Sequence, residues 1–448
     1  MNIRLAGTNN AENSKGEPED ANTVLEAPLD KAVFPLTGGR SDPPDHFAAL
    51  NPLTMPDWDK LVLSHPQSSI FHSAAWAQVL SNTYRHTPTY TGCLERGRLR
   101  CLLPIMEVNS WLTGRRGVSL PFSDFCEPLT SERADSRKLL ESAIKLGRSR
   151  GWKYFEWRGQ GLTEDSAPAA NFLAHTVDLA GGEHDLFGRL ESSTRRAIRK
   201  AEKLGVHVQF STDLKAVRRY YQLHCQTRRR HGLPPQPFSF FQKIHEHVIS
   251  KGLGFVALAH LADGGLRPAD CAGRASAVRT QGASTCMPIS GFDKSELTHN
   301  REAIAGAVYF HFGRHALYKF SASDERFQEM RGNNLIMWRA IQWFRAGGYA
   351  ALQLGRTSPC QKGLRRYKLG FGAREQSIKY FKYDLRMGTF RAAPDLNGGR
   401  HNQIFRGLPS MVNRCLGFLV YRHLHGIAVG LIDNDANLSY AVEQLNVV

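Results

Sequence analysis

A basic segment near the end of the chain is the first place where the residue types suggest chemistry. Residues 363–381, GLRRYKLGFGAREQSIKYF, gather cationic side chains and glycines around aromatic residues. Arg365 and Arg366 present planar guanidinium groups that bind phosphate through paired hydrogen bonds, whereas Lys368 presents a compact point charge. The segment therefore predicts a site that handles an anionic group.

A second basic surface is expected in the segment 191–206, ESSTRRAIRKAEKLGV. Its apolar residues recur with the period of a helix, so the cationic side chains collect on the outer face. Such a face is either solvated or bound to phosphates, and a phosphate-rich acceptor or the backbone of tRNA would account for its charge. The cations are Arg195, Arg196, Arg199, Lys200 and Lys203.

The whole chain is basic as well. Its 448 residues hold 58 Lys and Arg against 41 Asp and Glu, which gives a formal net charge of +17. A charge of this sign favours polyanionic partners such as RNA, phosphorylated substrates or an anionic membrane face, and it says nothing about the fold. The length suffices for two or three domains with substantial cores.

The cysteine pattern and the hydropathy favour a cytoplasmic protein. The eight cysteines are scattered singly, with no CxxC pair and no Cys/His spacing suited to zinc. The N-terminus lacks the apolar run of a signal peptide, and no stretch of about 18 apolar residues would span a bilayer. Residues 411–432 come nearest, but charged residues and histidines interrupt them. They predict an amphipathic surface helix that lies either on the protein or in a membrane interface, where it would contact an anionic inner membrane peripherally.

The elements that must position the basic residues form two units of similar order. In the first unit, 46–180, the signals predict helix, hairpin, strand, helix and strand. Ser73 is expected to cap the first helix, and Arg96 with Gly97 to form the hairpin turn. The expected elements are a helix over 73–80, two strands within 87–109, a strand over 117–122, a helix over 131–151 and a strand over 153–159.

The second unit, 181–390, has a similar order and contains the basic segment. The glycines of that segment would each weaken a long helix by roughly 1 kcal/mol, so they predict a short helix over 363–369 and a strand over 377–383. The other expected elements are helices over 191–206, 214–232 and 333–348, and strands within 254–262, 303–324 and 349–357.

Three segments are set apart from these units. Residues 1–45 are expected to be a disordered tail, because they have too little apolar surface to offset the entropy of ordering. The stretch 263–303 is expected to be an insertion, either a functional lid or disordered, because long structureless connections are uncommon in compact domains. Both are expected to be largely dispensable for folding. Residues 391–448 form a C-terminal tail that carries the amphipathic helix.

Several motifs together resemble the FemAB-like branch of the GNAT acyltransferase superfamily, over roughly residues 60–385. They are YKFSASDERFQEMRGNNLIMW, LQLGRTSPCQKGLRRYKLGFGARE, STRRAIRKAEKLGV, FHSAAWAQVL and GRRGVSLPFSDF. The resemblance implies an α/β (α+β) fold of two tandem GNAT-like domains, each a mixed, largely antiparallel sheet flanked by helices. It also implies transfer of an acyl or aminoacyl group to an amine. In Fem-type enzymes the donor is aminoacyl-tRNA and the acceptor is a peptidoglycan precursor.

The same resemblance assigns roles to particular residues. Its aromatic-Lys-x-Gly-Phe run falls on residues 367–371, and its lysine, here Lys368, lies in the transfer site. A fixed ammonium stabilises the oxyanion that develops during aminolysis. Lys368 fits that catalytic role, unless it holds a donor phosphate or is a solvated surface lysine. The residues expected to bind substrates are Tyr318, Asn334, Arg356, Arg365 and Tyr367, with Arg195 and Arg199 on the basic helix.

Asp324 and two asparagines after it each allow two interpretations. Asp324 follows the strand in YKFSASD, where GNAT strands end beside the reacting centre. Its carboxylate can act catalytically by accepting the proton that the attacking amine loses, or it can cap a helix or turn. Asn333 and Asn334 start a helix whose amide terminus can hold an anion. The simpler interpretation makes them its N-caps.

The donor stays open at this point. The only match to the pyrophosphate-binding pattern of acetyl-CoA enzymes, residues 345–350, follows a helix and precedes a strand, and it fits a helix C-terminus better. Acyl-CoA and aminoacyl-tRNA both remain, as an activated acyl donor and co-substrate rather than a tightly bound cofactor. No metal is expected, because aminolysis of an activated ester requires positioning more than a Lewis acid.

The sequence therefore predicts a cytoplasmic bacterial N-acyltransferase that acts on an amine of a cell-envelope or exopolysaccharide precursor. Its partners would be the activated donor, tRNA among the candidates, and a phosphorylated, nucleotide-linked or lipid-linked glycan. The alternative is a non-catalytic basic module of the GNAT fold that binds RNA or a lipid-linked glycan.

Overall fold

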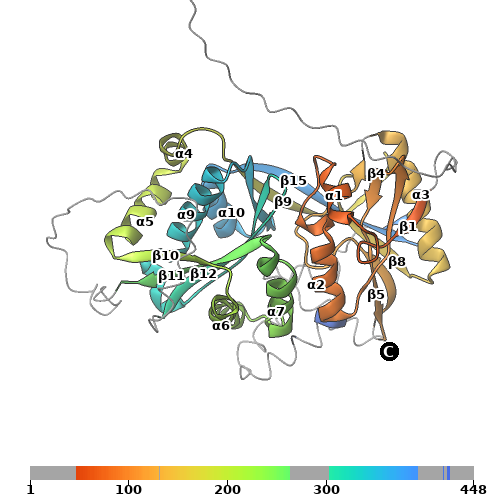
Figure 1. Ribbon diagram of the computed structural model, residues 1–448. Coiled ribbons are helices and arrows are strands. Elements are labelled where there is room, and N and C mark those ends of the chain that lie inside the picture. Colours follow the sequence, from red (N-terminus) through yellow and green to blue (C-terminus); the bar gives the residue numbers. More distant parts are fainter. Residues whose placement is uncertain are drawn as a thin grey trace, which may run out of the picture. The chain divides into compact units, whose positions relative to one another are not determined.

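The computed structural model describes residues 47–111, 113–130, 132–262, 302–391, 417 and 421–423. The tail 1–45, nearly all of the insertion 263–303 and most of the C-terminal tail, with its predicted amphipathic helix, lie outside these residues. The described chain is a mixed α/β fold with a 12-stranded sheet and a 4-stranded sheet (Figure 1).

Helices and strands alternate in both halves of the described chain, and the two halves meet near residue 180. The first half holds β1 (Phe47–Leu50), α1 (Trp58–Leu63), η1 (Ile70–His72), α2 (Ala74–Tyr84), β2 (Thr87–Pro88), β3 (Tyr90–Glu95), β4 (Arg98–Leu103), β5 (Met106–Ser110), β6 (Gly114–Val118), β7 (Leu129–Thr130), α3 (Arg133–Ser149), β8 (Tyr154–Gly159) and β9 (Pro168–Asp178). The second half holds α4 (Glu183–Arg189), α5 (Ser192–Lys203), β10 (Val206–Ser211), α6 (Leu214–Arg230), α7 (Phe238–His247), η2 (Ile249–Lys251), β11 (Gly254–Leu261), β12 (Ala303–Phe312), β13 (His315–Ser323), η4 (Glu325–Met330), α9 (Gly332–Ala346), β14 (Ala351–Thr357), α10 (Lys362–Leu369), β15 (Arg374–Asp384) and β16 (Thr389–Phe390).

The large sheet runs in the order β10-β11-β12-β13-β14-β9-β15-β8-β6-β5-β2, with β16 paired to β15. Among the described strands, the pairs β13/β14 and β6/β8 are parallel and the other pairs of named strands are antiparallel. The small sheet has the order β1-β3-β4-β7. This arrangement confirms the predicted fold class, with largely antiparallel sheets flanked by helices.

Strand β15 joins the two halves of the large sheet. It pairs with β9 from Arg374 and with β8 to Asp384, so a strand of the second half lies between two strands of the first half. Strand β9 in turn pairs only with β14 and β15 among the described strands. The sheet is therefore continuous across residue 180, where the sequence predicts a domain boundary.

Two layers of helices cover the sheet in the second half, and the alternation of side chains along each strand explains both layers. On β11, Val256 and Leu258 pack with the core of α6 and α7, whereas Phe255 and Ala257 pack with the core of α9. Successive side chains of a strand point to opposite faces, so a strand that is apolar throughout needs cover on both. Figure 1 shows α6 and α7 on one side of β10–β12 and α5 and α9 on the other.

A single hydrophobic cluster extends through elements of both halves. Trp76 of α2, in the first half, is fully buried and makes edge-on or tilted ring contacts with Phe240 of α7 and Phe310 of β12. The halves are thus packed together through aromatic side chains, which bury large apolar areas.

Most of the predicted elements are present, and the capping chemistry explains several of their bounds. The side chain of Ser73 accepts a hydrogen bond from the backbone N–H of Trp76 at the start of α2, as predicted. Arg96 and Gly97 both have positive φ in the turn between β3 and β4, as the hairpin requires. The helix predicted over 363–369 is α10.

Two local predictions are wrong. The strand expected over 117–122 is β6, which ends at Val118; Pro121 has no N–H for a ladder, and Phe122 turns the chain with φ of 60°. The N-cap of α9 is Arg331, with φ of 58°, so Asn334 lies inside the first turn rather than at the cap.

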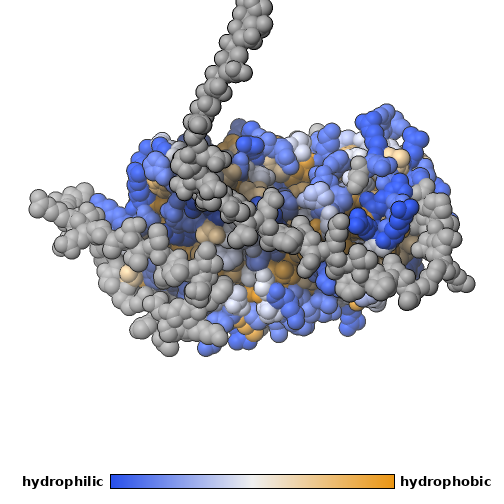
Figure 2. Space-filling model, turned by 45° about the horizontal axis from the view of Figure 1, so that its top comes forward, coloured by the Kyte–Doolittle hydropathy of each residue, from blue (hydrophilic) through white to orange (hydrophobic). Residues whose placement is uncertain are grey.

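The surface of the described chain is mostly polar on the face that Figure 2 shows, with apolar side chains set among hydrophilic ones. No helix within the described residues has the length and apolar character needed to cross a membrane.

Candidate active site

Lys368 is the best-defined functional group of the basic segment. It lies near the end of α10 with only 3% of its surface exposed, and its Nζ donates hydrogen bonds to the carbonyl oxygens of Gly355 (3.0 Å) and Arg356 (2.9 Å) on β14. Burial lowers the pKa of Lys368 to about 7, an effect that Arg356 and Lys319 add to and Asp124 opposes. An ammonium has three protons to donate, so one remains for a further acceptor.

The two carbonyl groups that accept hydrogen bonds from Lys368 lie where the parallel strands β13 and β14 separate. β13 and β14 pair at only three positions, which end at Leu317 and Gln353, although both strands continue beyond them. The pairing of β14 with β9 also shifts register between Gln353 and Arg356, and Gly355 has φ of +68°. Glycine adopts this left-handed conformation without steric cost. The irregularity turns two carbonyl groups toward Lys368.

Asp124, which belongs to the first half of the chain, also lies beside Gly355. One of its carboxylate oxygens accepts a hydrogen bond from Lys319 Nζ at 3.0 Å, in an ion pair whose side chains are almost buried. The same oxygen, Oδ2, also lies against Gly355, where a Cβ would come within 3.1 Å of it. Asp124 and Lys368 therefore meet the same glycine of β14, and the negative charge of Asp124 raises the pKa of Lys368.

The loop that carries Asp124 is held by hydrogen bonds to its backbone. The guanidinium of Arg158 donates to the carbonyl oxygens of Leu120 and Ser123, the latter at 2.7 Å, and the hydroxyl of Tyr380 donates to the carbonyl oxygen of Asp124. The loop is thus fixed by side chains of β8 and β15. The sequence reasoning missed Asp124, although it stands in the motif SLPFSDF; a carboxylate directly after a Pro-Phe turn was the available signal.

Arg356, predicted to bind substrate, lies beside this group on β14. Its guanidinium lies over the ring of Phe172 at 4.7 Å and near that of Tyr380 at 5.6 Å. Cation–π contacts of this kind hold the guanidinium of an arginine in place.

Tyr318 and Tyr367 connect β13 to α10. Tyr367 is hydrogen-bonded to Tyr318 and donates through its hydroxyl to the carbonyl oxygen of Asn333 at 3.0 Å. Burial raises the pKa of Tyr318 to about 12 and that of Tyr367 well above its usual value, so both are neutral phenols near pH 7. They can donate hydrogen bonds and cannot serve as bases.

Tyr367 also lines a basic groove of about 630 Å³. The beginnings of α5, α9 and α10 all border it, and helix N-termini favour anions. Four cationic side chains border it, from α5, α10 and the N-cap of α9, together with one carboxylate. The lining residues are Glu191, Ser193, Thr194, Arg196, Ala197, Lys200, Arg331, Asn334, Gly363, Arg366 and Tyr367.

Close packing of α5 against α10 shapes this groove. The backbone N–H of Glu191 donates to the carbonyl oxygen of Gly370 at 2.9 Å, and a Cβ on Gly370 would come within 2.5 Å of the Thr194 hydroxyl. Only glycine permits this approach, so the basic helix and the segment of Lys368 lie together as one surface.

All four predicted arginines, Arg356 among them, lie outside the groove lining. Arg195 donates to the carbonyl oxygen of Gly188 at 3.0 Å, and Arg199 lies over the ring of Phe187 at 5.4 Å. Arg365 makes a bidentate ion pair with Glu375, at 2.7 and 2.8 Å. On the basic helix, Arg196 and Lys200 are the residues that border the groove.

Asp324 is engaged as a cap. Its carboxylate accepts hydrogen bonds from the backbone N–H of Arg326 at 2.9 Å and from the guanidinium of the same residue, which also reaches Glu302. These hydrogen bonds hold the pKa of Asp324 below its usual value, which weakens it as a base. Between the two interpretations of Asp324, this geometry favours the cap.

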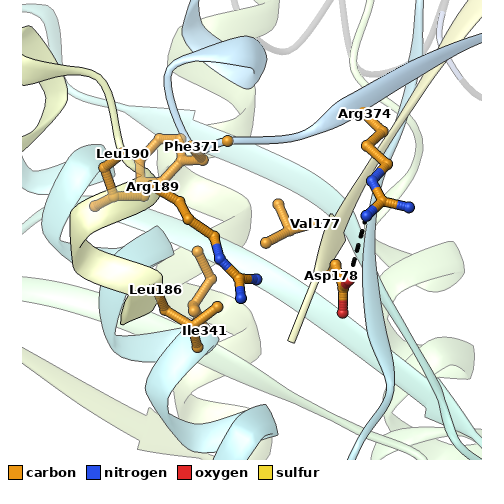
Figure 3. A pocket seen from close by; sticks show the side chains of 9 residues that line it. Val177, Asp178, Leu186, Arg189, Leu190, Ile341, Phe371 and Arg374 are labelled. Carbon is orange, nitrogen blue, oxygen red and sulfur yellow. Dashed lines mark ion pairs between the residues drawn. The ribbon is translucent and has the colours of Figure 1, made fainter. Parts of the chain in front are cut away.

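A smaller cavity of about 170 Å³ lies between α4, α9 and the strands β9 and β15. Figure 3 shows the side chain of Arg189 among Leu186, Ile341 and Val177, with Arg374 at the edge. Arg374 forms a long ion pair with Asp178 at 3.6 Å. None of the predicted site residues lines this cavity. Within the described ranges, no three His, Cys, Asp or Glu side chains are grouped to hold a metal ion.

Comparison with known proteins finds a family that matches part of this site. Residues 290–373 match the family model described as an acetyltransferase (GNAT) domain. This segment is a GNAT acyltransferase domain, and it contains Lys319, Gly355 and Lys368. The fold is similar to the crystal structure of FemX, with a TM-score of 0.54, 14% identity, and coverage of 75% of this chain and 96% of that one. At the level of the fold, the predicted FemAB-like resemblance is confirmed.

Two other solved structures are similar over comparable lengths. One is the C-terminal domain of a putative lysylphosphatidylglycerol synthetase from Agrobacterium fabrum (13% identity, 72% and 89% coverage, TM-score 0.43). Another is a tandem GNAT protein from the clavulanic acid biosynthesis pathway (10% identity, 76% and 98% coverage, TM-score 0.44). Their TM-scores are too low to bear on function. Among curated protein sequences, none matches this chain.

Proposed function

We propose that the protein is an N-acyltransferase that moves an acyl or aminoacyl group from a phosphate-bearing donor to an amine of a cell-envelope or exopolysaccharide precursor. The observation that carries the proposal is that two charged side chains meet at Gly355: buried Lys368, with one proton left to donate, and Asp124, an acidic group from the opposite half of the chain. A non-catalytic module has no need to bury a lysine at this cost.

Lys368 and Asp124 have separate roles in the proposed reaction. The amine nitrogen of the acceptor attacks the carbonyl carbon of the donor, and the negative charge passes to the carbonyl oxygen. The free proton of the Lys368 ammonium stabilises that oxyanion. Asp124 takes the proton that the amine loses, and the leaving group, a thiolate or an alkoxide, departs with the bonding electron pair as the carbonyl re-forms.

The basic groove supplies the donor site in this proposal. A donor such as acyl-CoA or aminoacyl-tRNA carries several phosphates, which match Arg196, Lys200, Arg331 and Arg366 around the helix beginnings. Tyr367 borders the groove and is hydrogen-bonded to Tyr318 on β13, so a donor that extends past it would bring its acyl group toward Lys368. The FemX likeness supports the fold in which this transfer would occur, and not the identity of the substrates.

The test is a transfer assay that combines a panel of acyl-CoAs and aminoacyl-tRNAs with amine-bearing nucleotide-linked and lipid-linked sugars, read by product mass. Formation of an amide product by the wild-type protein, and its loss on Lys368→Ala, is the expected outcome. Lys362→Ala is the matched control, because Lys362 lies on the same helix and is exposed. Tight binding of a donor or glycan without any product across the panel would instead favour a non-catalytic module.

A further inference from the structure

The hairpin of β5 and β6 presents an aromatic residue to solvent. Trp111, in the turn between the two strands, is 85% exposed, the highest exposure of any large apolar side chain described. Its ring packs edge-on against that of His423, with the two ring centres 5.8 Å apart. An indole in this position exposes a large apolar area that neither the core nor the proposed transfer site uses.

Cationic side chains lie around this tryptophan. Arg115 is exposed on β6, and its carbonyl oxygen accepts the backbone N–H of Lys153 at 2.9 Å. The exposed side chain of Lys153 crosses over Gly114 in the same turn. Arg422 lies next to His423 in the C-terminal helical turn and adds a third positive charge.

The hairpin tip is held firmly by the residues behind it. The fully buried guanidinium of Arg116 donates to the hydroxyl of Thr113 and, at 2.7 Å, to the carbonyl oxygen of His423. The hydroxyl of Ser110 receives the backbone N–H of Thr113 at 3.1 Å and bonds to the His423 ring. Burial lowers the pKa of His423, so its ring is neutral at pH 7 and the charge at the tip comes from Arg115, Lys153 and Arg422.

We infer that the hairpin tip around Trp111 docks on an anionic phospholipid surface. Tryptophan is favoured at the boundary between lipid headgroups and acyl chains, since one edge of its ring is apolar and the other donates a hydrogen bond. The surrounding cations match the negative potential of an anionic leaflet. A single projecting indole with spread positive charge suits a surface of lipids better than one shaped protein partner. This contact is independent of the transfer chemistry and of the groove.

Vesicle sedimentation of the full chain tests the inference, with phosphatidylcholine vesicles prepared with and without phosphatidylglycerol. The wild-type protein should bind the anionic vesicles and release them at high salt, since exposed charge attraction is screened. Trp111→Ala should weaken binding on the order of tenfold, and Arg115→Glu combined with Lys153→Glu should weaken it at least as much. Met387→Ala is the control, because Met387 is 69% exposed in a different turn and should bind like the wild type.

Circular dichroism confirms that each variant is folded. Equal binding to neutral and anionic vesicles, or no binding to either, would overturn the inference. So would a folded Trp111→Ala protein that binds like the wild type, because the predicted C-terminal amphipathic helix would then account for membrane binding without the hairpin. Retained vesicle binding of the charge variant, together with loss of its binding to tRNA, would show that these cations serve a nucleic acid.

Discussion

At the scale of single residues, Lys368 stands out because burial and charge act on it in opposite directions. Burial, Arg356 and Lys319 favour the neutral amine and Asp124 opposes them, so the pKa of about 7 leaves Lys368 partly protonated at neutral pH. A lysine held near this balance can both donate a hydrogen bond to an oxyanion and respond to a substrate that brings further charge.

Removal of this side chain tests its role directly. Lys368→Ala is expected to lower kcat about a hundredfold, a loss on the order of 3 kcal/mol of transition-state stabilisation. Lys368→Arg should recover only part of it, because a planar guanidinium does not fit where a compact ammonium bonds two carbonyl groups. Steady-state kinetics with Lys362→Ala as control measures this, and a folded Lys368→Ala enzyme with unchanged turnover would exclude Lys368 from the mechanism.

The pH dependence of the rate follows from the same group. The pKa of Lys368 lies at about 7 and the oxyanion requires the protonated form, so kcat should fall as the pH rises through this value. Asp124→Asn removes a negative charge that raises the pKa, so the residual activity of that variant should decline at lower pH than in the wild type. Rate–pH profiles of the wild-type and Asp124→Asn proteins test the direction of this shift. A profile that rises through pH 7 would mean that the neutral amine is the active form.

At the scale of elements, the site depends on the distortion of β14. Gly355 combines a positive φ with close contacts to Asp124 on one side and to Lys368 through its carbonyl oxygen. A regular strand would offer neither feature, since its carbonyl groups are committed to the ladder. The bulge therefore brings two charged side chains from separate halves of the chain to one backbone position.

Replacement of this glycine should affect catalysis more than stability. Gly355→Ala is expected to cost about 1–2 kcal/mol for the left-handed backbone and to displace Asp124, with a marked fall in kcat. Gly97→Ala is the control, because Gly97 has φ of +75° in an open turn with nothing within 4 Å of a Cβ. Thermal unfolding and kinetics of both variants separate the effect of backbone strain, which the two share, from the effect of the contact with Asp124, which only Gly355 makes. Similar kinetics for the two variants would show that the position of Asp124 does not depend on Gly355.

The basic helix α5 allows a matched comparison along one element. Arg196→Ala with Lys200→Ala should raise the KM for the donor and flatten its dependence on salt, with little change in kcat, as expected for contacts made equally in ground and transition states. Arg195→Ala with Arg199→Ala should change KM less, since these residues lie outside the groove. The reverse order of effects would place the donor on the other face of α5.

The sequence predicted elements whose signals are local and missed those that depend on distant partners. The cap at Ser73 and the turn at Gly97 depend on neighbouring residues, so the pattern located them. Strand β9 was missed because its pairing partners, β14 and β15, come much later in the chain. The same holds for the site: a motif indicated Lys368, whereas only the folded chain brings Asp124 to it.

At the scale of the whole molecule, the aromatic cluster makes the two halves depend on each other. Trp76→Ala is expected to destabilise the protein by about 3–5 kcal/mol, because it empties a fully buried site. The loss should appear in both halves together, since Trp76 contacts Phe240 and Phe310. Calorimetry combined with hydrogen exchange measures this, and loss of protection confined to the first half would show two independently stable domains.

The late position of β15 also determines the order in which the protein can be completed during translation. β9 leaves the ribosome without any strand to pair with, and roughly 200 residues, or about 10–40 seconds of synthesis, pass before β14 and β15 emerge. Through that interval β8 has an open edge and β9 has two, and open edges template association with other chains. Nascent chains of this protein therefore depend on shielding until the last long strand arrives, and a premature stop before Arg374 would release an aggregation-prone fragment rather than a smaller folded domain.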